Sequence, residues 1–386
     1  MNDHMVNRPE GGALGRRGFL TAAAATGIAA AGLAASGGLA RAASAPRPAA
    51  AGTFRVPAED VRHTRTWMAF PDSGSIWGGA LCGVQSDIAL IARTIAAYEP
   101  VYLCANPASA AKARSLCGPT VTVLTSIPVD DCWMRDSGPV FRTDGAGGLD
   151  AVGLNFNGWG NKQTHARDAL VAGRIAAYAG VPFTAAGVVG EGGAVEQDGA
   201  GTLMATRSSL VNKNRNPGVS QTQIEAALRT AYGASKVIWF DGVVGQDITD
   251  DHVDATSRFL VPGRAVVQMP LATDTDAYAK DARRQYQVLS AATAADGTRM
   301  AVEQIQGPDY DKIRSTNRDF LASYANYYLC NGAVISAHFG DTRADAAAGA
   351  TLARLYPGRT IEQLNIDRLG TGGGGIHCVT QQQPVP

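Results

Sequence analysis

The stretch GTGGGGIHCVTQQQP, Gly370 to Pro384, is the last of four polar clusters whose spacing along the chain predicts the fold. The earlier clusters are DDCWMRDSGP, GEGGAVEQDG and TDDHVD, which contain Asp136, Glu191 and His252. Successive clusters are roughly 60 residues apart, and about twice that interval precedes Cys378. A recurring unit of this length is typical of a repeat architecture whose equivalent loops meet on one face. The spacing therefore predicts that the four clusters converge.

Strand-like and helix-like stretches alternate from residue 55 to residue 386. Apolar runs rich in β-branched residues predict strands, and patterns with helical period predict helices between them. Ser220 and Asp345 are typical of helix starts, and Gly233 and Gly358 of helix ends. The sequence therefore predicts one large α/β domain over residues 55–386. The predicted strands lie at 100–104, 120–129, 236–240, 264–271 and 331–340, and the predicted helices at 87–98, 166–180, 220–233, 277–295 and 343–358.

The composition is that of a globular protein with a large core. The chain has 386 residues, of which 45% are hydrophobic and 18% charged, and this balance argues against disorder and against a coiled coil. Its 34 basic and 34 acidic residues cancel, so nothing in the net charge favours nucleic acid or an anionic surface as a partner. A small molecule or a protein is the expected substrate.

The first 45 residues differ from the rest of the chain. The segment GRRGFL places Arg16 and Arg17 before a weakly apolar stretch of alanine, glycine and leucine that closes with small residues. This pattern predicts a twin-arginine signal peptide over residues 1–45, followed by a linker at 46–54. The alternatives are an ordinary secretory signal and a single membrane anchor. We expect the twin-arginine translocase to export the protein to the periplasm or the medium, and we expect no later segment to span a membrane.

Six cysteines are scattered along the chain without a C-x-x-C pair, so the sequence predicts no zinc cluster or redox motif. Disulfides remain open, because an exported protein can form them. Cys378 is a candidate nucleophile, since thiolates react readily and the neighbouring glycines allow a close approach; the alternative is a buried cysteine that acts as a small hydrophobic residue. In an extended segment His377 points to the opposite face, so the partner base is expected elsewhere.

The segment DITDDHVDATSRF supplies that base. In an extended chain His252 and Asp254 share one face, with Asp251 and Val253 on the other. Histidine can donate and accept protons near neutral pH, and a carboxylate on the same face can orient it or bind a cation. The alternative is a solvated acidic turn.

Asp136 and Glu191 are flanked by glycines and are either turn residues or further members of the site. Three acids, a histidine and a thiol make an empty site negative, which suits a cationic substrate. A guanidinium stays protonated and presents a planar fork that two carboxylates can hold. Trp133 either packs along such a substrate or belongs to the core. The sequence contains no spacing of metal ligands, so neither a metal nor a cofactor is expected.

At eight places the sequence resembles agmatine deiminases, within the wider family of bacterial peptidylarginine deiminases. The resemblance runs from about Thr66 to Pro384. It implies an α/β-propeller of five ββαβ units around a pseudo-fivefold axis, the pentein fold, with the site at its centre and no metal. Homodimers are common in the family. The matching segments are TWMAFP, DDCWMRDSGPVF, NFNGWGNK, EGGAVEQDGAGTLMATRSSLVNKNRNP, HVD, NYYLCNG, FGD and GGGGIHCVTQQQP.

The resemblance also implies a role for each candidate residue. Cys378 attacks the guanidinium carbon, and His252 protonates the departing ammonia and then activates water against the amidino-thioether. Asp136 and Asp254 hold the guanidinium nitrogens, while Glu191 pairs with the substrate or with His252. Such covalent catalysis divides one difficult displacement into two easier steps.

Two positions depart from the family pattern and bear on substrate identity. Asp251 stands where glycine usually precedes the histidine, and Gly375 stands where asparagine usually precedes Ile-His-Cys. The predicted reaction is hydrolysis of agmatine to N-carbamoylputrescine and ammonia, a step of putrescine biosynthesis and polyamine metabolism. The alternative is an exported deiminase that converts peptidyl-arginine or free arginine to citrulline. A propeller that only binds guanidino compounds is a third reading, which the thiol disfavours because binding alone does not require one.

Overall fold

The computed structural model describes residues 53–317 and 320–386. The predicted signal peptide, residues 1–45, and nearly all of the linker at 46–54 lie outside the described residues. The predicted catalytic domain, residues 55–386, falls within a single compact unit, Ala50–Pro386.

Five small mixed sheets make up the described part of the chain. In each of the four three-stranded sheets an antiparallel pair is followed by a helical crossover and a third strand parallel to the second, so each of the four is a ββαβ unit. These four follow one another directly along the chain. Their strands are β4 (Val140–Thr143), β5 (Leu149–Gly153) and β6 (Phe183–Ala185); β7 (Val195–Gln197), β8 (Thr202–Thr206) and β9 (Lys236–Phe240); β10 (Ser257–Val261), β11 (Arg264–Met269) and β12 (Ala301–Gln306); and β13 (Tyr328–Cys330), β14 (Ala333–Ala337) and β15 (Thr360–Leu364).

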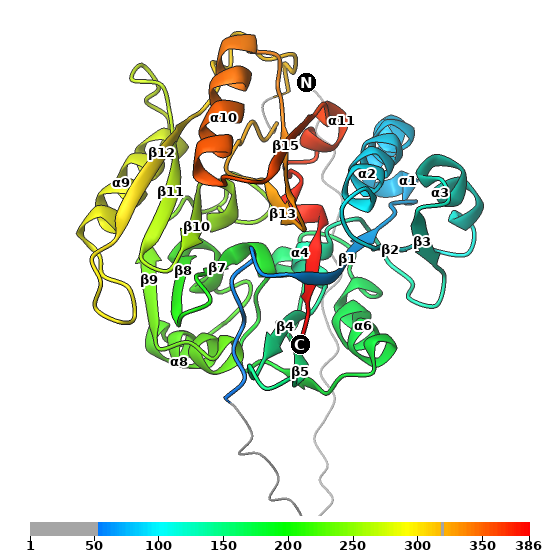
Figure 1. Cartoon of the computed structure of the whole chain (residues 1–386), viewed down its shortest axis with the longest axis horizontal. Coiled ribbons are helices and arrows are strands. Elements are labelled where there is room, and N and C mark those ends of the chain that lie inside the picture. The colour runs from blue at the N-terminus through cyan, green and yellow to red at the C-terminus, as the bar shows by residue number, and fades with distance from the viewer. Residues whose placement is uncertain (1–52, 318–319) are drawn as a thin grey trace, which may run out of the picture. The chain divides into compact units, whose positions relative to one another are not determined.

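The fifth sheet joins the two ends of the unit. Strand β16 (Gln381–Pro384) pairs antiparallel with β1 (His63–Ala69), and β2 (Val101–Cys104) and β3 (Val121–Leu124) extend the sheet in parallel. Figure 1 shows β16, in red, crossing the blue β1. Because Cys378 comes just before β16, this pairing fixes the position of the candidate nucleophile.

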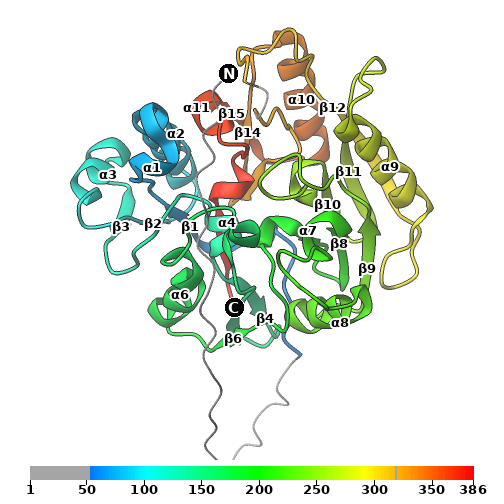
Figure 2. The ribbon, with the colours of Figure 1, turned by 180° about the vertical axis from the view of Figure 1, so that it is seen from behind.

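The long helices connect strands within the sheets. In both views they lie toward the outside of the unit, whereas the short helix α4 (Met134–Ser137) and the segment before β16 lie toward the middle (Figures 1 and 2). The short segments at the middle carry the polar clusters of the sequence. The long helices are α2 (Leu81–Ala96), α3 (Ala110–Cys117), α6 (Val171–Ala179), α8 (Gln221–Tyr232), α9 (Ala277–Ala291) and α10 (Thr342–Leu355).

The predicted elements are found at or near their expected places. Strand β9 has the predicted bounds, and α8 begins with a complete capping box at Ser220 and ends at Gly233 in the left-handed conformation. Asp345 lies in the first turn of α10, near the helix start as predicted, but it is not the cap. Helix α10 is capped by Asp341, which accepts a hydrogen bond from the amide of Ala344, while Asp345 is buried and accepts from the Tyr324 hydroxyl at 2.7 Å.

One stretch differs from the expectation that no later segment resembles a membrane span. Residues Gly74–Ala96 are long and apolar enough by length and composition to cross a membrane. Eight side chains of α2 are buried in the unit, and Ile88, Ile91 and Ile95 belong to its largest apolar cluster. The helix therefore has the contacts of a core helix, which passes the same composition test.

Trp67 of β1 provides a test of the sheet that joins the two ends. Its side chain is buried, and its indole N–H donates to Gln383 Oε1 of β16 at 3.0 Å. Trp67→Ala is expected to lower the free energy of unfolding by about 3–5 kcal/mol, because it leaves a large cavity. Urea unfolding followed by far-UV circular dichroism measures the change.

The control is Val385→Ala, just after β16, where the side chain is 44% exposed and truncation is expected to cost less than about 0.5 kcal/mol. Equal unfolding free energies for the two variants would contradict the importance of the β1–β16 contact.

Candidate active site

The polar clusters of the sequence converge around Gly193. A methyl group built on this glycine would lie 2.7 Å from His252 Nδ1, 2.9 Å from Asp136 Oδ1 and 3.1 Å from Asp254 Oδ2. Position 193 must therefore be glycine, because any side chain would occupy the space between these groups. Three of the predicted site residues thus face one small region, although they come from different sheets or their connections.

His252 lies between two carboxylates. Its Nε2 is 3.2 Å from Glu191 Oε2, and its Nδ1 is 3.8 Å from Asp136 Oδ1. Burial alone would lower the pKa of this imidazole, but the charge of Asp136, the hydrogen bond with Glu191 and the charge of Asp254 together raise the pKa to about 9. His252 is therefore protonated at neutral pH and can act as an acid.

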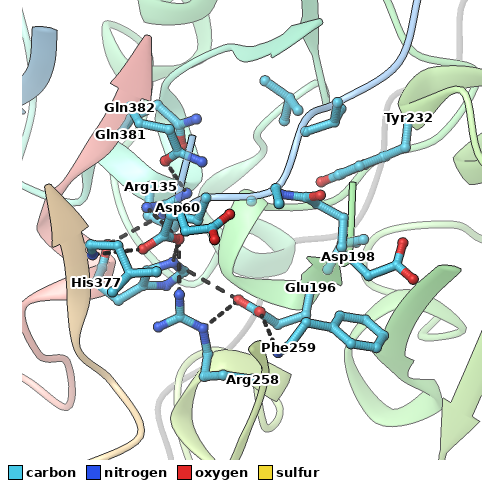
Figure 3. A pocket seen from close by; sticks show the side chains of 18 of the residues that line it. Asp60, Arg135, Glu196, Asp198, Tyr232, Arg258, Phe259, His377, Gln381 and Gln382 are labelled. Atoms are coloured by element: carbon cyan, nitrogen blue, oxygen red, sulfur yellow. Dashed lines mark hydrogen bonds and ion pairs between the residues drawn. The ribbon is translucent and has the colours of Figure 1, made fainter. Parts of the chain in front are cut away.

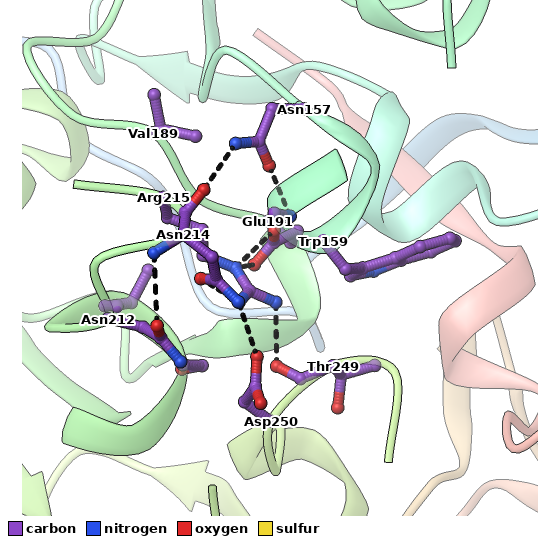
Figure 4. A network of polar contacts seen from close by, with 12 residues as sticks. Asn157, Trp159, Val189, Glu191, Asn212, Asn214, Arg215, Thr249 and Asp250 are labelled. Carbon is purple, nitrogen blue, oxygen red and sulfur yellow. Dashed lines mark hydrogen bonds and ion pairs between the residues drawn. The ribbon is translucent and has the colours of Figure 1, made fainter. Parts of the chain in front are cut away.

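Arg215 holds Glu191 in place (Figure 4). Its Nε donates to both carboxylate oxygens at 2.8 and 3.0 Å, and neither side chain is exposed. Burial raises the pKa of Glu191, but the charge of Arg215 and the hydrogen bond with His252 outweigh it and bring the pKa below its usual value. Glu191 is thus ionised and supports the positive charge of His252. Arg215 was not among the site residues predicted from the sequence, although it stands in the long segment that resembles the family.

The turn before His252 is strained. Asp250 and Asp251 have φ angles of 60° and 71°, which residues other than glycine rarely adopt. Asp250 Oδ2 accepts hydrogen bonds from Arg215 Nη1 at 2.8 Å and from Lys162 Nζ at 2.7 Å, and these ion pairs stabilise the turn. The contacts of Arg215 therefore fix two features beside the His252 imidazole, which are the carboxylate of Glu191 and the backbone turn that precedes His252.

The prediction that residues 251–254 form an extended segment is wrong. Val253–Ala255 forms a short 3-10 helix, η4, because the left-handed residues before it turn the chain. His252 and Asp254 nevertheless both approach Gly193. Asp254 is buried, which excludes the solvated acidic turn as an interpretation.

Asp136 accepts hydrogen bonds on both carboxylate oxygens. Oδ1 accepts from the amide of Gly193 at 3.0 Å, and Oδ2 accepts from the indole N–H of Trp159 at 2.9 Å. Burial raises the pKa of this carboxyl despite the nearby charge of His252, and Asp254 and Glu191 raise it further. A cation placed beside Asp136 and Asp254 would relieve this repulsion between carboxylates.

The Cys378 thiol faces Asp254 and Asn326. Its Sγ is 3.9 Å from Asp254 Oδ2 and 3.4 Å from Asn326 Nδ2. Burial, followed by the charges of Asp254 and Asp136, raises the pKa of the thiol well above its usual value. The thiol is therefore neutral in the empty site. All six cysteines are free within the described residues, so no disulfide involves this one.

His377 points away from the reactive group of its neighbour. The segment His377–Val379 is a 3-10 helix, η5, so the expectation of an extended chain is wrong here too. The imidazole Nδ1 is 2.6 Å from Asp254 Oδ2, and Nε2 is 2.9 Å from Glu59 Oε2. His377 therefore contacts carboxylates on both sides.

Trp133 packs against the glycine loop that precedes Cys378. Its ring lies 5.9 Å from that of Trp77, and the two indole N–H groups donate to the two oxygens of Asp131 at 2.9 and 2.7 Å. A methyl group on Gly374 would lie 2.2 Å from the Trp133 ring. Trp133 is thus largely buried, as a core residue would be, and it also borders the loop that presents the thiol.

A second set of charged side chains lies behind the site, on the far side of His377 from the thiol. We call Glu59, Arg135, Glu196, Arg258 and His377 the buried charge cluster (Figure 3). Arg258 lies 2.8 Å from Glu59 and 2.7 Å from Glu196. These residues line a cavity of about 30 Å³, enough for one or two waters, and Cys378 is not part of its wall.

No metal site accompanies these residues. Among residues 53–317 and 320–386, no three or more histidine, cysteine, aspartate or glutamate side chains are grouped so that they could hold a metal ion.

Comparison with known proteins identifies the family. Residues 55–384 match the model of the Porphyromonas-type peptidyl-arginine deiminases. The chain belongs to this family. A Streptomyces coelicolor relative, provisionally named an agmatine deiminase, is 39% identical over 345 residues, covering 86% of this chain and 99% of the relative. The agmatine deiminase of Stutzerimonas stutzeri is 33% identical over 356 residues, with 86% and 96% covered.

The fold of the deiminase family agrees with the structure described above. The solved agmatine deiminase of Enterococcus faecalis superposes with a TM-score of 0.81 at 27% identity, covering 88% of this chain and all of the other.

Gly374 provides a test of the loop that presents the thiol. Gly374→Ala is expected to lower the catalytic efficiency of this deiminase about 10- to 100-fold, because the added methyl group collides with Trp133 and displaces the loop. Steady-state kinetics with a guanidino substrate measures the loss. Gly79→Ala is the control, since nothing lies within 4 Å of its added methyl group, and equal activities of the two variants would contradict the predicted collision.

The titration of His252 provides a second test. Its imidazole is expected to titrate at a pKa of about 9 in the free protein, and Asp136→Asn is expected to lower this pKa by removing the strongest nearby charge. NMR of the ring protons measures the titration, with the signal assigned by its loss in His252→Asn. Asp144→Asn, in a separate turn, is the control and should leave the titration curve of His252 unchanged. An unchanged curve in Asp136→Asn would contradict the predicted interaction between Asp136 and His252.

Proposed function

We propose that this protein is an agmatine deiminase, which hydrolyses the guanidino group of agmatine to N-carbamoylputrescine and ammonia. The relatives named agmatine deiminase and the family match support this activity. The observation that carries the proposal is a thiol beside two buried carboxylates, with a protonated histidine across from them. Such a site suits a planar cation whose carbon can be attacked by sulfur.

Asp136 and Asp254 are proposed to hold the guanidinium. Asp254 Oδ1 is buried and accepts no hydrogen bond from any described residue, so a guanidinium N–H would satisfy it. Asp136 would bind a second nitrogen while keeping its bonds to Gly193 and Trp159. Trp133, beside the glycine loop, is proposed to pack along the aliphatic part of the substrate.

The positive charge of the substrate also activates the nucleophile. Burial and the charges of Asp254 and Asp136 keep the thiol of Cys378 neutral. A bound guanidinium offsets the charge of the carboxylates, so the thiol releases its proton to solvent when substrate binds. The resulting thiolate attacks the guanidinium carbon to form the C–S bond of a tetrahedral adduct. This arrangement reserves the reactive thiolate for a cationic substrate.

His252 then acts twice. As an imidazolium it gives a proton to the departing nitrogen, the C–N bond breaks, and ammonia leaves an amidino-thioether on Cys378. The neutral imidazole next accepts a proton from water, whose oxygen attacks the same carbon. The C–S bond breaks, the remaining O–H proton of the adduct passes to the leaving sulfur and restores the thiol, and the neutral ureido product leaves. Glu191 stabilises the charged imidazole throughout.

We further propose that the five ββαβ units surround a pseudo-fivefold axis, with the site at the centre of an α/β-propeller. The outer position of the long helices and the convergence of four polar clusters support this arrangement. Export by the twin-arginine pathway rests on residues 1–45 of the sequence alone, as does a periplasmic or extracellular location. A role in polyamine metabolism follows from the proposed product, and a homodimer follows only from the resemblance to the family.

The second candidate is an exported peptidyl-arginine or arginine deiminase that produces citrulline. The family model, named for peptidyl-arginine deiminases, favours it, and so does the predicted signal peptide. Its chemistry is the same, and the two candidates differ in what surrounds the guanidinium.

Turnover of three substrates tests the proposal. Purified protein is incubated with agmatine, free arginine and an arginine-containing peptide, and ammonia and ureido product are measured. Agmatine is expected to give the highest catalytic efficiency, and Cys378→Ala is expected to lower it by roughly 10⁴-fold or more, because the nucleophile is lost. A chelator is expected to leave the rate unchanged.

The control for the nucleophile is Cys82→Ala, which removes an exposed cysteine and should retain wild-type activity. Turnover of the peptide but not of agmatine would move the protein to the second candidate. Unchanged turnover in Cys378→Ala would refute the assignment of the nucleophile, and loss of activity with the chelator would refute the metal-free mechanism.

A further inference from the structure

The carboxylate of Asp254 is held on one oxygen only. Oδ2 contacts His377 Nδ1 at 2.6 Å, whereas Oδ1 has no partner among the described residues although it is buried. Burial raises the pKa of Asp254, but the hydrogen bond with His377 and the charges nearby lower it below its usual value. The contact therefore fixes which oxygen is free to face a guanidinium and keeps the carboxylate ionised.

The second ring nitrogen of His377 is also held. Nε2 lies 2.9 Å from Glu59 Oε2, and Arg258 Nη2 contacts the same oxygen at 2.8 Å. Glu59 Oε1 accepts from the amide of Leu329 at 2.9 Å. Each ring nitrogen therefore contacts a carboxylate oxygen, Nδ1 that of Asp254 and Nε2 that of Glu59. The ring cannot rotate without breaking one of these two contacts.

The other members of the buried charge cluster, Arg135 and Glu196, also contact His377 or its partners. Arg135 Nε donates to the backbone oxygen of His377 at 3.3 Å, and its Nη2 lies 3.6 Å from Glu59 Oε2. Glu196 Oε1 lies 3.9 Å from His377 Nε2 and is paired with Arg258. The imidazole is thus anchored on its ring, on its backbone and through its partner.

We propose that His377 is a positioning residue for the deiminase reaction, which orients Asp254 toward the substrate by a hydrogen bond from Nδ1 while Glu59 fixes the ring through Nε2. The inference rests on the proposed function, because the role of Asp254 is to bind the guanidinium. It distinguishes the two nitrogens of the ring, since Nδ1 acts on the site and Nε2 only anchors the ring. It assigns a role to the residue that the sequence analysis set aside as a partner for Cys378.

Two amide substitutions separate the roles of the two nitrogens. Counted in bonds from Cβ, the amide nitrogen of asparagine stands where Nδ1 of histidine does, and that of glutamine stands where Nε2 does. His377→Asn therefore keeps the donor to Asp254 and loses the contact with Glu59, whereas His377→Gln keeps the contact with Glu59 and loses the donor to Asp254. Both variants remove the same ring from the same place.

The expected result is an unequal effect on catalysis. His377→Gln is expected to lower kcat/KM for agmatine about a hundredfold, mainly through KM, because a misplaced Asp254 no longer binds the guanidinium correctly. His377→Asn is expected to stay within about tenfold of the wild type, and both variants are expected to lower the melting temperature by similar amounts. A merely structural role would lower activity in step with the melting temperature in both variants, and that result, or a greater loss in His377→Asn, would overturn the proposal.

Calorimetry separates this inference from the proposed function. Each substitution is combined with Cys378→Ala, and the binding of agmatine and of methylguanidine is measured without turnover. Weaker binding in the glutamine variant than in the asparagine variant supports the role of His377, even if the wild type fails to hydrolyse agmatine and the proposed function is wrong. Equal affinities in the two variants, or no binding of either compound to Cys378→Ala, would overturn the inference.

Discussion

The neutralisation of charges in the buried charge cluster is the constraint on which the site depends. Ionised groups buried away from water are stable only when they are paired, and here Arg258 pairs with both Glu59 and Glu196. The three side chains belong to separate parts of the chain. Pairing them brings the segment before β1, strand β7 and strand β10 together at one point, so the requirement for neutrality is also a requirement on the arrangement of the units.

Each polar segment serves both sides of this point. Helix α4 directs Asp136 to the site and Arg135 to the buried charge cluster. The segment η5 likewise directs Cys378 to the site and His377 to the buried charge cluster. Neighbouring residues in a tight turn point in different directions, so one short motif can supply a group that meets substrate and a group that anchors it. The position of each reactive side chain is thereby coupled to the packing of the interior, which keeps the geometry of the site rigid.

The sequence alone predicted an α/β fold and the convergence of the polar clusters. It did not predict the contacts that hold the side chains of these clusters in position. Strand β9 and helix α8 follow from local pattern and capping, which depend on neighbouring residues only. The convergence of the clusters follows from their spacing. By contrast, Glu59 and Arg215 act through residues far away in the sequence. The left-handed turn at Asp250 and Asp251 is stabilised by ion pairs of Asp250 that no local pattern reveals.

The pairing of β1 with β16 has a consequence for the order of events in folding. Its register joins His63 to Pro384, so this sheet cannot form until almost the whole unit has been synthesised, and contacts so distant in sequence form slowly. The thiol lies just before β16 and meets Asp254 only in the closed structure. A nascent or incompletely folded chain therefore lacks the assembled site, and the proposed chemistry can begin only when the two ends of the unit have met.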